Sequence, residues 1–411
     1  IADVTHYVKP GSARDLEAAA RSTSVYLVDR RIDMIPARLS TNLCSLHAGV
    51  ERLAFSTVWR LNEKAEIIET RFFKSVIKSK AALAYSEAQE RIDLAEPGDD
   101  PITHACRNLM HLARLIKQRR IDNGALTLAS SEVKFKLAGK QGDENREALE
   151  MGMYKTTEAH SLVEEFMLLA NVSVAEHILR AYPTMALLRR HPTPAAEMLE
   201  TLVRAGRAWG FDVDISSGKA LSDSLDKMID SDDKMFNKVV RMLTTRCMTQ
   251  AKYMSSGEFA EKAFQHFGLA CNTYTHFTSP IRRYADIIVH RLLATSLGIA
   301  PLPDMIRDKA HMRDVVENLN HRHRMAQLAS RASTEVWTLA FFSGKDVVTS
   351  GRILNVRATG VRVLVPQFGI ECALRLVPRD GAKDVFTVPD GDDAERYQHK
   401  RFIHDPNQVA L

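Results

Sequence analysis

The sequence predicts an α+β fold, with a mixed sheet and many helices in the core, followed by a smaller all-β module. Helical periodicity dominates long runs such as 158–181, whereas runs rich in β-branched and aromatic residues, such as 53–61, resemble strands. Near Ser343 the pattern changes from helical to alternating, which indicates a domain boundary. We therefore expect one domain at 1–343 and a second at 344–411.

The composition is that of a globular chain with a mildly basic character. The chain has 411 residues, enough for two or three domains, a net charge of +5 and a pI of about 8.9. This balance is compatible with a polyanionic partner but is weak evidence alone. The arginines form close pairs: Arg30–Arg31, Arg119–Arg120, Arg189–Arg190, Arg282–Arg283 and Arg322 with Arg324. Each pair is more often a solvated surface, and only their convergence on one channel would make a path for RNA.

The cysteines and the hydropathy of the sequence indicate in which compartment the protein is found and whether it spans a membrane. The five cysteines are far apart and include no C-x-x-C pair, which favours free thiols in a reducing compartment over a disulfide framework or a zinc site. No apolar run approaches the length of a membrane span, and no signal peptide is visible. We therefore expect an intracellular protein without a membrane partner.

The elements follow in order along the chain. In the first part we expect strands at 1–8, 25–27, 32–35, 124–128 and 133–137, a hairpin of 53–61 with 67–77, and helices at 13–21, 85–94 and 102–120. Residues 139–152 are polar and are predicted to be a mobile loop. Further helices are expected at 158–181, 196–210, 219–228, 237–251 and within 304–340, with an irregular loop at 186–194. The C-terminal strands are expected at 347–357, 361–365 and 370–374.

The stretch His266–His290 contains a local conflict that suggests a binding site. Ser279 and Pro280 are suited to the N-cap and the first position of a helix. Arg282 and Arg283 then fall in the first turn, where exposed N–H groups already make the helix end positive. A bound phosphate would resolve the conflict. The alternative is that Arg282 pairs with Asp286 and Arg283 faces solvent.

The same stretch resembles the signature of the RNase II (RNB) exoribonuclease family. The residues that carry the resemblance are H-F-G-L, a spacer, then H-F-T-S-P-I-R-R-Y-A-D and a further H. Supporting runs include V-Y-L-V-D-R-R-I-D-M-I-P, V-E-E-F-M-L-L-A-N and N-H-R-H-R-M-A-Q-L-A-S-R-A. The resemblance covers roughly residues 1–343 and is strongest to the RNase-II-type catalytic subunit of the eukaryotic RNA exosome.

This resemblance implies a function and a set of partners. Members of the family are hydrolases that remove nucleotides one at a time from the 3′ end of single-stranded RNA and release nucleoside 5′-monophosphates. The exosome branch implies exosome core subunits as partners and a location in the nucleus or the cytoplasm. The family also carries an S1-type OB barrel at the C-terminus, which here would be incomplete, because 377–411 does not provide two clear closing strands. The alternative is an RNB-like protein that binds RNA without cleaving it.

The metal site that the family implies is not expected within this chain. The family holds two Mg²⁺ ions with four aspartates in a D-x₅-D-x-D-D run just before its I-A-D segment, and this chain begins at Ile1 of that segment. We therefore expect the ligands upstream of Ile1 and the chain alone to be inactive. Asp230, Asp232 and Asp233 have D-x-D-D spacing, but Ser224 stands where the fourth carboxylate would be, so a solvated loop is expected.

Two side chains match the family's functional residues most directly. Arg282 matches the arginine beside the reacting phosphate, where a fixed cation would stabilise developing charge. Tyr26 matches the aromatic residue that stacks near the 3′-terminal base, an interaction that tolerates any sequence. Gln327 stands where a bacterial relative has a glutamate, so no acidic role is carried over.

Other residues of the motifs are expected to support the site. Arg283 is a candidate RNA contact, Tyr284 and Asp286 should build and orient the site, with Asp286 restraining an arginine, and Asp3 should cap the strand next to the metal cluster. His276 and His290 are more often structural than catalytic in such a pattern.

Overall fold

The computed structural model describes residues 1–94, 98–129, 133–139, 148–153, 156–357 and 360–375. The chain divides into two compact units, the first made of 1–129 with 155–331 and the second of 130–154 with 332–411. The segment 130–154 thus belongs with the C-terminal part of the chain, although it is distant in sequence. The division falls inside the long helix α11 (Lys309–Phe342), which contributes to both units.

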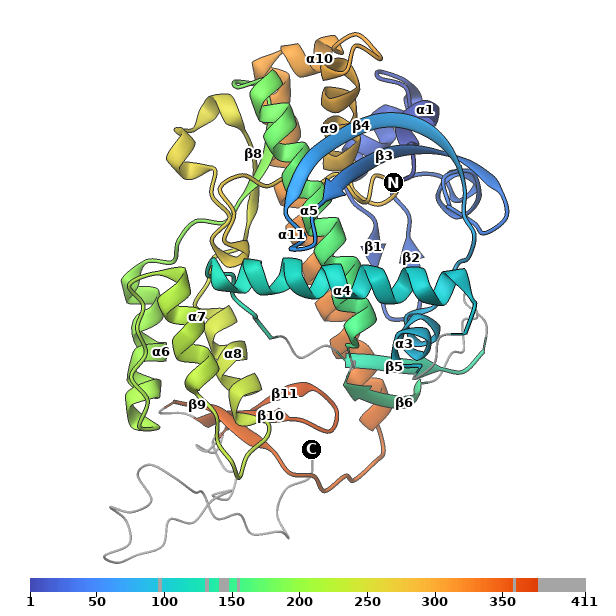
Figure 1. Ribbon diagram of the computed structural model, residues 1–411. Helices are drawn as coiled ribbons and strands as arrows, with labels where there is room; N and C mark the ends of the chain where they lie inside the picture. The colour runs from blue at the N-terminus through green and yellow to red at the C-terminus, as the bar shows by residue number, and fades with distance from the viewer. Residues whose placement is uncertain (95–97, 130–132, 140–147, 154–155, 358–359, 376–411) are drawn as a thin grey trace, which may run out of the picture. The chain divides into compact units, whose positions relative to one another are not determined.

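Helices dominate the first unit, and most lie where their periodicity predicted them (Figure 1). They are α1 (Val4–Tyr7), α2 (Ala13–Arg21), α3 (Tyr85–Asp93), α4 (Pro101–Asp122), α5 (Glu158–Ala181), α6 (Ala196–Ala208), α7 (Gly218–Lys227), α8 (Phe236–Arg246), α9 (Tyr284–Ser296), α10 (Asp304–Arg307) and the first part of α11. The start of α4 shows how local chemistry sets a boundary. The Asp100 carboxylate accepts the N–H groups of Ile102 and Thr103, and Pro101 occupies the first helical position.

The strands of the first unit form three separate antiparallel pairs. These are β1 (Val25–Tyr26) with β2 (Arg31–Ile32), β3 (Glu51–Leu61) with β4 (Ile67–Lys78), and β7 (Leu187–Arg190) with β8 (Lys252–Ser255). The predicted hairpin is confirmed, but the predicted mixed sheet core is wrong for the described residues. The strands occur as separate pairs, and the interior is occupied by helix α9, which is buried on all sides.

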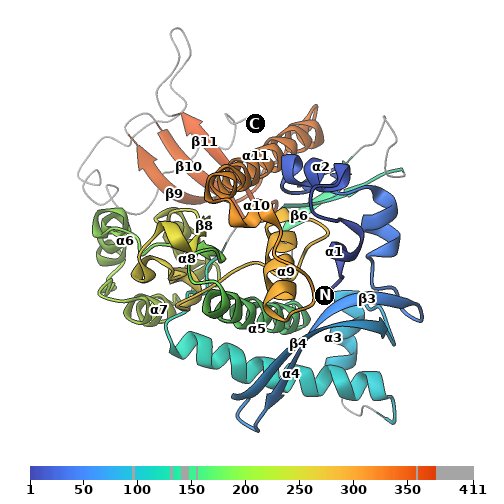
Figure 2. The ribbon, with the colours of Figure 1, turned by 90° about the horizontal axis from the view of Figure 1, so that it is seen from above.

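Helix α9 lies in the interior of the first unit. Every residue from Tyr284 to Ala294 is buried. Helices α1 and α5 and strand β7 pack against it, and Figure 1 and Figure 2 both show α5 beside it. The largest hydrophobic cluster includes Phe55, Ile178, Leu187, Ile288 and Leu292, which come from β3, α5, β7 and α9. The core therefore fixes α9, and with it the loop that leads into α9.

A buried polar network joins α2 to α9. The Arg291 guanidinium and the Asp15 carboxylate are 2.6 Å apart (Nη2–Oδ1), and both side chains are almost fully buried. The Tyr284 hydroxyl donates to the same Asp15 oxygen at 2.9 Å, and the Gly11 N–H donates to the other at 2.9 Å. Because these groups satisfy the carboxylate away from water, the network sets the position of α2 against the core.

The second unit contains two antiparallel sheets among its described residues. One is the pair β5 (Val133–Leu137) and β6 (Ala148–Met153). The other has three strands in the order β9 (Arg352–Arg357), β10 (Gly360–Val365) and β11 (Ile370–Arg375). The three predicted C-terminal strands are therefore found, and among the described residues they form a three-stranded antiparallel meander. Residues 376–411, where the barrel would be completed, lie outside the described part of the chain.

Four local predictions are wrong. Residues 1–8 form one β-bridge, from Ala2 to Ala54, and then the short helix α1, because β3 provides a partner only for the first residues. Residues 124–128 are extended but unpaired with any strand, with Leu126 N–H bonded to the Gly268 carbonyl. The predicted loop at 186–194 contains β7, which pairs with the distant β8. The predicted loop at 139–152 ends in β6, which pairs with the preceding β5, and its residues 140–147 lie outside the described part of the chain.

We expect Arg291→Met to lower the free energy of unfolding by about 3–5 kcal/mol, because it leaves the Asp15 carboxylate buried without its cation. Chemical denaturation would measure the change. Arg307→Met is the matched control, since Arg307 and Asp304 form an exposed pair, 3.7 Å apart, and its removal should leave stability nearly unchanged. Equal effects of the two substitutions would contradict a structural role for the network.

Candidate functional site

The loop that precedes α9 is anchored by other elements at several points. Thr275 Oγ1 donates to the Leu187 carbonyl of β7 at 2.6 Å. The Phe277 N–H donates to Asn171 Oδ1 of α5 at 2.8 Å. The Ser279 N–H donates to Asp286 Oδ1 at 2.7 Å. The loop backbone is therefore held in place before any ligand is present.

The helix begins four residues later than predicted, with Arg283 rather than Ser279 as its N-cap. The Ser279 carbonyl accepts the N–H groups of Arg282 and Arg283, both at 3.1 Å, so Ser279 and Pro280 open a tight turn instead of a helix. The Asp286 carboxylate accepts the Ser279 N–H and so holds this turn against the first turn of α9. The residue preferences of helix caps do not include such a contact, which is why they misplaced the start of the helix.

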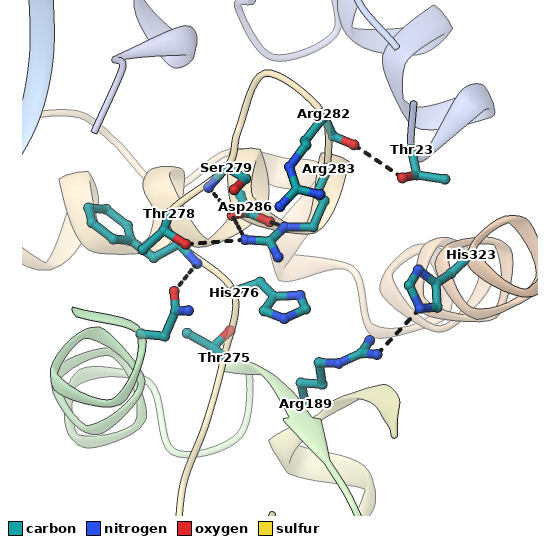
Figure 3. A network of polar contacts seen from close by, with 12 residues as sticks. Thr23, Arg189, Thr275, His276, Thr278, Ser279, Arg282, Arg283, Asp286 and His323 are labelled. Atoms are coloured by element: carbon teal, nitrogen blue, oxygen red, sulfur yellow. Dashed lines mark hydrogen bonds and ion pairs between the residues drawn. The ribbon is translucent and has the colours of Figure 1, made fainter. Parts of the chain in front are cut away.

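Arg283 and Asp286 form a bidentate ion pair inside the protein (Figure 3). Nε and Nη2 of Arg283 each lie 2.8 Å from a carboxylate oxygen, and the Asp286 side chain has no solvent exposure. As expected, Asp286 restrains an arginine, but the alternative pairing of Arg282 with Asp286 is wrong. Arg283 therefore stabilises the loop through its ion pair with Asp286. The contact with RNA that the sequence predicts for Arg283 stays a prediction.

Arg282 has the opposite environment. Its carbonyl accepts hydrogen bonds from Ser24 N–H at 3.0 Å and from Thr23 Oγ1 at 3.1 Å, the latter drawn in Figure 3. Its side chain is exposed, and its guanidinium makes no ion pair or hydrogen bond with any described residue. A fixed backbone with a free guanidinium can bind an anion without a large loss of backbone entropy.

Tyr26 lies on the segment whose backbone is bonded to Arg282. It follows Ser24, which donates to the Arg282 carbonyl, by two residues, and its side chain is 45% exposed, unusually high for a large aromatic residue. Tyr284 is bonded to the same segment and to α2, since its N–H donates to the Ser22 carbonyl at 2.8 Å and its hydroxyl to Asp15. The structure thus ties the segment that carries Tyr26 to the backbone of Arg282 and Tyr284.

Asp3 is buried at the start of α1 rather than at the end of a strand. Its carboxylate accepts from Thr5 Oγ1 at 2.6 Å and lies 2.9 Å from Lys74 Nζ of β4. Burial opposes the charged form, but the bonds from Thr5 and Lys74 and the charge of Lys74 hold the Asp3 pKa below its ordinary value. Asp3 therefore ties α1 to the hairpin, and no side-chain cap of the helix by Asp3 is present.

Basic groups are concentrated beneath the loop, around a residue that sequence reasoning did not select. Arg189 of β7 is only 8% exposed, and its guanidinium carbon lies 4.7 Å from the centre of the Tyr253 ring. Nη2 of Arg189 lies 3.5 Å from Nε2 of His323 of α11, whereas Nη1 is buried without a hydrogen-bond partner (Figure 3). The only feature of the sequence that marks Arg189 is its pairing with Arg190, and such a pair by itself more often indicates a solvated surface.

The neighbouring histidines are held neutral. Burial, and then the charges of Arg283 and Arg189, lower the pKa of His276 well below its ordinary value. Burial and the same two arginines lower the pKa of His323 to about 4. His276 accepts or donates at Nδ1 with the Tyr253 hydroxyl at 2.6 Å, and His290 bonds the Phe277 carbonyl at 2.8 Å. Both histidines are thus bonded to groups of the core, and their expected structural role stays a prediction.

The described residues do not fit a magnesium site. Among them no group of three or more His, Cys, Asp or Glu side chains could hold a metal ion. The Asp3 and Asp286 carboxylates are occupied by Lys74 and Arg283. The D-x-D-D run is a loop, as predicted, with its carboxylates turned to backbone N–H groups of the same segment.

Comparison with known proteins decides the family. Residues 1–298 match the model of the RNB domain. The chain belongs to the RNB family. It is 54% identical over 371 residues to the exosome complex exonuclease RRP44 homolog A of Arabidopsis thaliana and 44% identical over 374 residues to the exosome complex exonuclease dis3 of Schizosaccharomyces pombe. These alignments cover 90% of this chain but only 39% and 38% of the relatives.

Solved structures with the same fold include RNB-type proteins of different activity. The apo form of Mycoplasma genitalium RNase R has a TM-score of 0.80 at 24% identity, covering 92% of this chain and 59% of that one. Yeast Ssd1, described as a pseudonuclease, has a TM-score of 0.76 at 22% identity, covering 91% and 45%. At these identities the likeness shows the fold alone. No helix among the described residues has the length and apolar character needed to cross a membrane.

We expect Arg283→Ala to lower the free energy of unfolding by about 3–5 kcal/mol, because it leaves the Asp286 carboxylate buried and unpaired. Arg282→Ala, the adjacent substitution of the same residue type, should leave stability nearly unchanged because its guanidinium is exposed. Urea denaturation of the two variants tests the assignment. A larger loss for Arg282→Ala would reverse the roles given to the two arginines.

His323 should make stability fall as the pH is lowered. Its pKa is about 4 in the folded protein and about 6.5 when unfolded, so the unfolded chain binds more protons between these values. The free energy of unfolding should therefore decrease from pH 6.5 toward pH 4, by less than ~1.4 kcal/mol per pH unit because His323 keeps some solvent contact.

Substitution of His323 tests this expectation. His323→Gln should make the free energy of unfolding depend less on pH between pH 6.5 and 5, whereas the control His321→Gln, exposed on the same helix, should not. Identical curves for wild type and His323→Gln would show that His323 is not the group responsible.

Proposed function

We propose that the protein is a 3′→5′ exoribonuclease that hydrolyses single-stranded RNA processively and releases nucleoside 5′-monophosphates as part of an exosome. The observation that carries the proposal is the exposed, unpaired guanidinium of Arg282 on a backbone fixed by Thr23 and Ser24. The identity to proteins named exosome complex exonucleases supports the same conclusion. The relatives' names, which mention the exosome complex, also support exosome core subunits as partners. We further propose the nucleus or the cytoplasm as the location.

In this proposal each side chain around the loop contacts or attracts a different part of the RNA end. The Arg282 fork binds a backbone phosphate and stabilises the charge that develops during hydrolysis. The exposed Tyr26 ring stacks on a base, which requires no particular sequence and so suits an enzyme that moves along a strand. The buried charge of Arg189 adds positive potential beneath the loop.

The chemistry proposed here requires divalent metal ions, which we propose to be Mg²⁺. Phosphate hydrolysis of this class uses metal ions to activate water and to stabilise the leaving oxygen. Because the described residues do not fit such a site, no step of the reaction is assigned to them beyond binding and orienting the RNA. We propose that the metal ligands lie outside the described part of the chain.

A binding function without catalysis is the second candidate. It is favoured by one observation, the similarity of fold to a protein described as a pseudonuclease. That similarity rests on 22% identity, whereas the relatives named exonucleases are 44% to 54% identical over 90% of the chain. The exoribonuclease is therefore the better supported proposal.

We expect Arg282→Ala in the full-length protein to lower turnover about 10²–10³-fold, the usual loss when a transition-state donor is removed. RNA affinity should change much less, because other contacts hold the strand. Single-turnover release of nucleoside monophosphates from a labelled RNA measures both. Arg204→Ala, an exposed arginine of α6, is the control and should leave turnover unaltered. Unchanged turnover in Arg282→Ala would exclude Arg282 from the reaction.

A further inference from the structure

The turn that follows helix α2 is strained and buried, and it leads directly to the residues that hold Arg282. Ser22, the residue after the end of α2, has φ +60° and ψ −32° although it is not a glycine, and its side chain is buried. The Thr23 N–H donates to the Arg21 carbonyl at 2.7 Å and closes a three-residue turn with Ser22 at its centre. A γ-turn with positive φ at its centre is rare and strained, so it persists only where surrounding contacts hold it.

Asn318 of α11 supplies these contacts. Its Nδ2 donates to the Ala19 carbonyl at 2.9 Å, to Ser22 Oγ at 3.0 Å and, more weakly, to the Ala20 carbonyl at 3.4 Å. Ser22 Oγ in turn donates to the Ala19 carbonyl at 2.8 Å. Figure 2 shows α2 beside α11. One amide therefore satisfies carbonyls at the end of α2, which have no partner within the helix, and fixes the hydroxyl of the strained residue.

Each residue of the turn then contacts the loop that carries Arg282. The Ser22 carbonyl accepts the Tyr284 N–H at 2.8 Å. Thr23 Oγ1 and the Ser24 N–H both donate to the Arg282 carbonyl, at 3.1 and 3.0 Å, and Figure 3 shows the first of these bonds. The conformation at Ser22 therefore sets where the backbone of Arg282 lies.

We propose that Asn318 is a positioning residue for Arg282. Asn318 holds the turn at Ser22 in its strained conformation, the turn holds the Arg282 carbonyl, and the exposed guanidinium extends from that fixed point. A displacement of about 1 Å between reacting groups can lower a rate by as much as about 10²-fold, so a contact two residues removed from the guanidinium can affect turnover. The inference rests on the proposed function, because the effect of Asn318 is measured through Arg282.

Asn237 of α8 provides a matched control, because its amide makes the same kind of contact with another helix. Asn237 Nδ2 donates to the Leu225 carbonyl at 2.7 Å and to the Met228 carbonyl at 2.9 Å, at the end of α7. Its Oδ1 accepts Arg241 Nε, and within the described structure none of these partners belongs to the Arg282 loop. Loss of either asparagine should therefore lower stability, whereas only the loss of Asn318 should affect Arg282.

The first test compares Asn318→Leu with Asn237→Leu in the full-length protein. We expect Asn318→Leu to lower single-turnover release of nucleoside monophosphates about ten-fold, because Arg282 is displaced from the reacting phosphate. Affinity for a labelled single-stranded RNA should stay near the wild-type value. Asn237→Leu should leave both quantities unchanged, although the urea midpoint should fall in both variants. Wild-type turnover in Asn318→Leu, or an equal loss in Asn237→Leu, would overturn the inference.

The second test asks whether the loss acts through Arg282. In the Arg282→Ala background, Asn318→Leu should lower turnover by less than about two-fold, because losses from residues that act as one unit do not add. A further ten-fold loss in that background would show that Asn318 acts elsewhere. If Asn318→Leu does not fold, Ser22→Ala replaces it, since this variant keeps the turn and removes only the hydroxyl that Asn318 contacts. Its loss of turnover should likewise disappear in the Arg282→Ala background.

The third test concerns the strain at Ser22. Glycine adopts positive φ at no steric cost, so the turn in Ser22→Gly needs less support. Asn318→Leu should therefore lower turnover less in the Ser22→Gly background than in the wild-type background. Ala65→Gly is the control, since Ala65 has φ +56° in the connection between β3 and β4, and it should leave the effect of Asn318→Leu as it is. An undiminished loss in the Ser22→Gly background would overturn the role of the strained turn.

The two proposals fail in different ways. If the wild-type protein releases no nucleotides from RNA, the proposed function is wrong and the inference about Asn318 with it. If Arg282→Ala lowers turnover whereas Asn318→Leu does not, the proposed function stands and only the inference about Asn318 is wrong.

Discussion

The ion pair between Arg283 and Asp286 is the interaction on which the candidate site depends. Asp286 is anchored in the buried helix α9, and its Oδ1 also accepts the Ser279 N–H. One carboxylate thus closes the loop and pairs with Arg283, whereas Arg282 stays exposed. Without Asp286, Arg283 would lose its ion pair and the Ser279 N–H its acceptor, although Thr275 and Phe277 would still anchor the loop. Arg282 and Arg283 are adjacent in the sequence, but Arg283 stabilises the loop whereas the Arg282 side chain faces solvent.

Positive charge inside the first unit is tolerated because most of the neighbouring titratable groups are neutral. Arg189 and Arg283 are buried within a group of histidines, and burial together with these cations keeps the protons off His276, His323 and His266. Asp286 pairs with Arg283, whereas Arg189 forms no ion pair with a carboxylate of a described residue and contacts His323 and the Tyr253 ring instead. The remaining positive potential is what a polyanionic strand would encounter, and it accounts for a basic interior in a chain of modest net charge.

The arginine pairs show why local sequence could not separate support from function. Arg120 is taken up by the buried Glu165, and Arg119 by the carbonyls of Lys64 and Ala65. Glu165, which belongs to the V-E-E run, is thus engaged in a buried ion pair. The Arg189–Arg190 pair predicts a solvated surface, yet Arg189 is buried next to His323 and Tyr253. A guanidinium has the same sequence signature in all these settings, and only its partners distinguish them.

The sequence by itself determined the family, the long helices and the β3–β4 hairpin, and it singled out Arg282 and Tyr26 as candidates, because motif, periodicity and residue type are local properties. Tertiary structure alone decided that α9 begins at Tyr284, that Arg283 is buried, that β7 pairs with β8 and that no mixed sheet forms among the described residues. It also brought Asn318 of α11 to the end of α2. These outcomes depend on which distant groups meet, and a hydrogen bond or ion pair between residues far apart in the chain leaves no periodic trace in either segment.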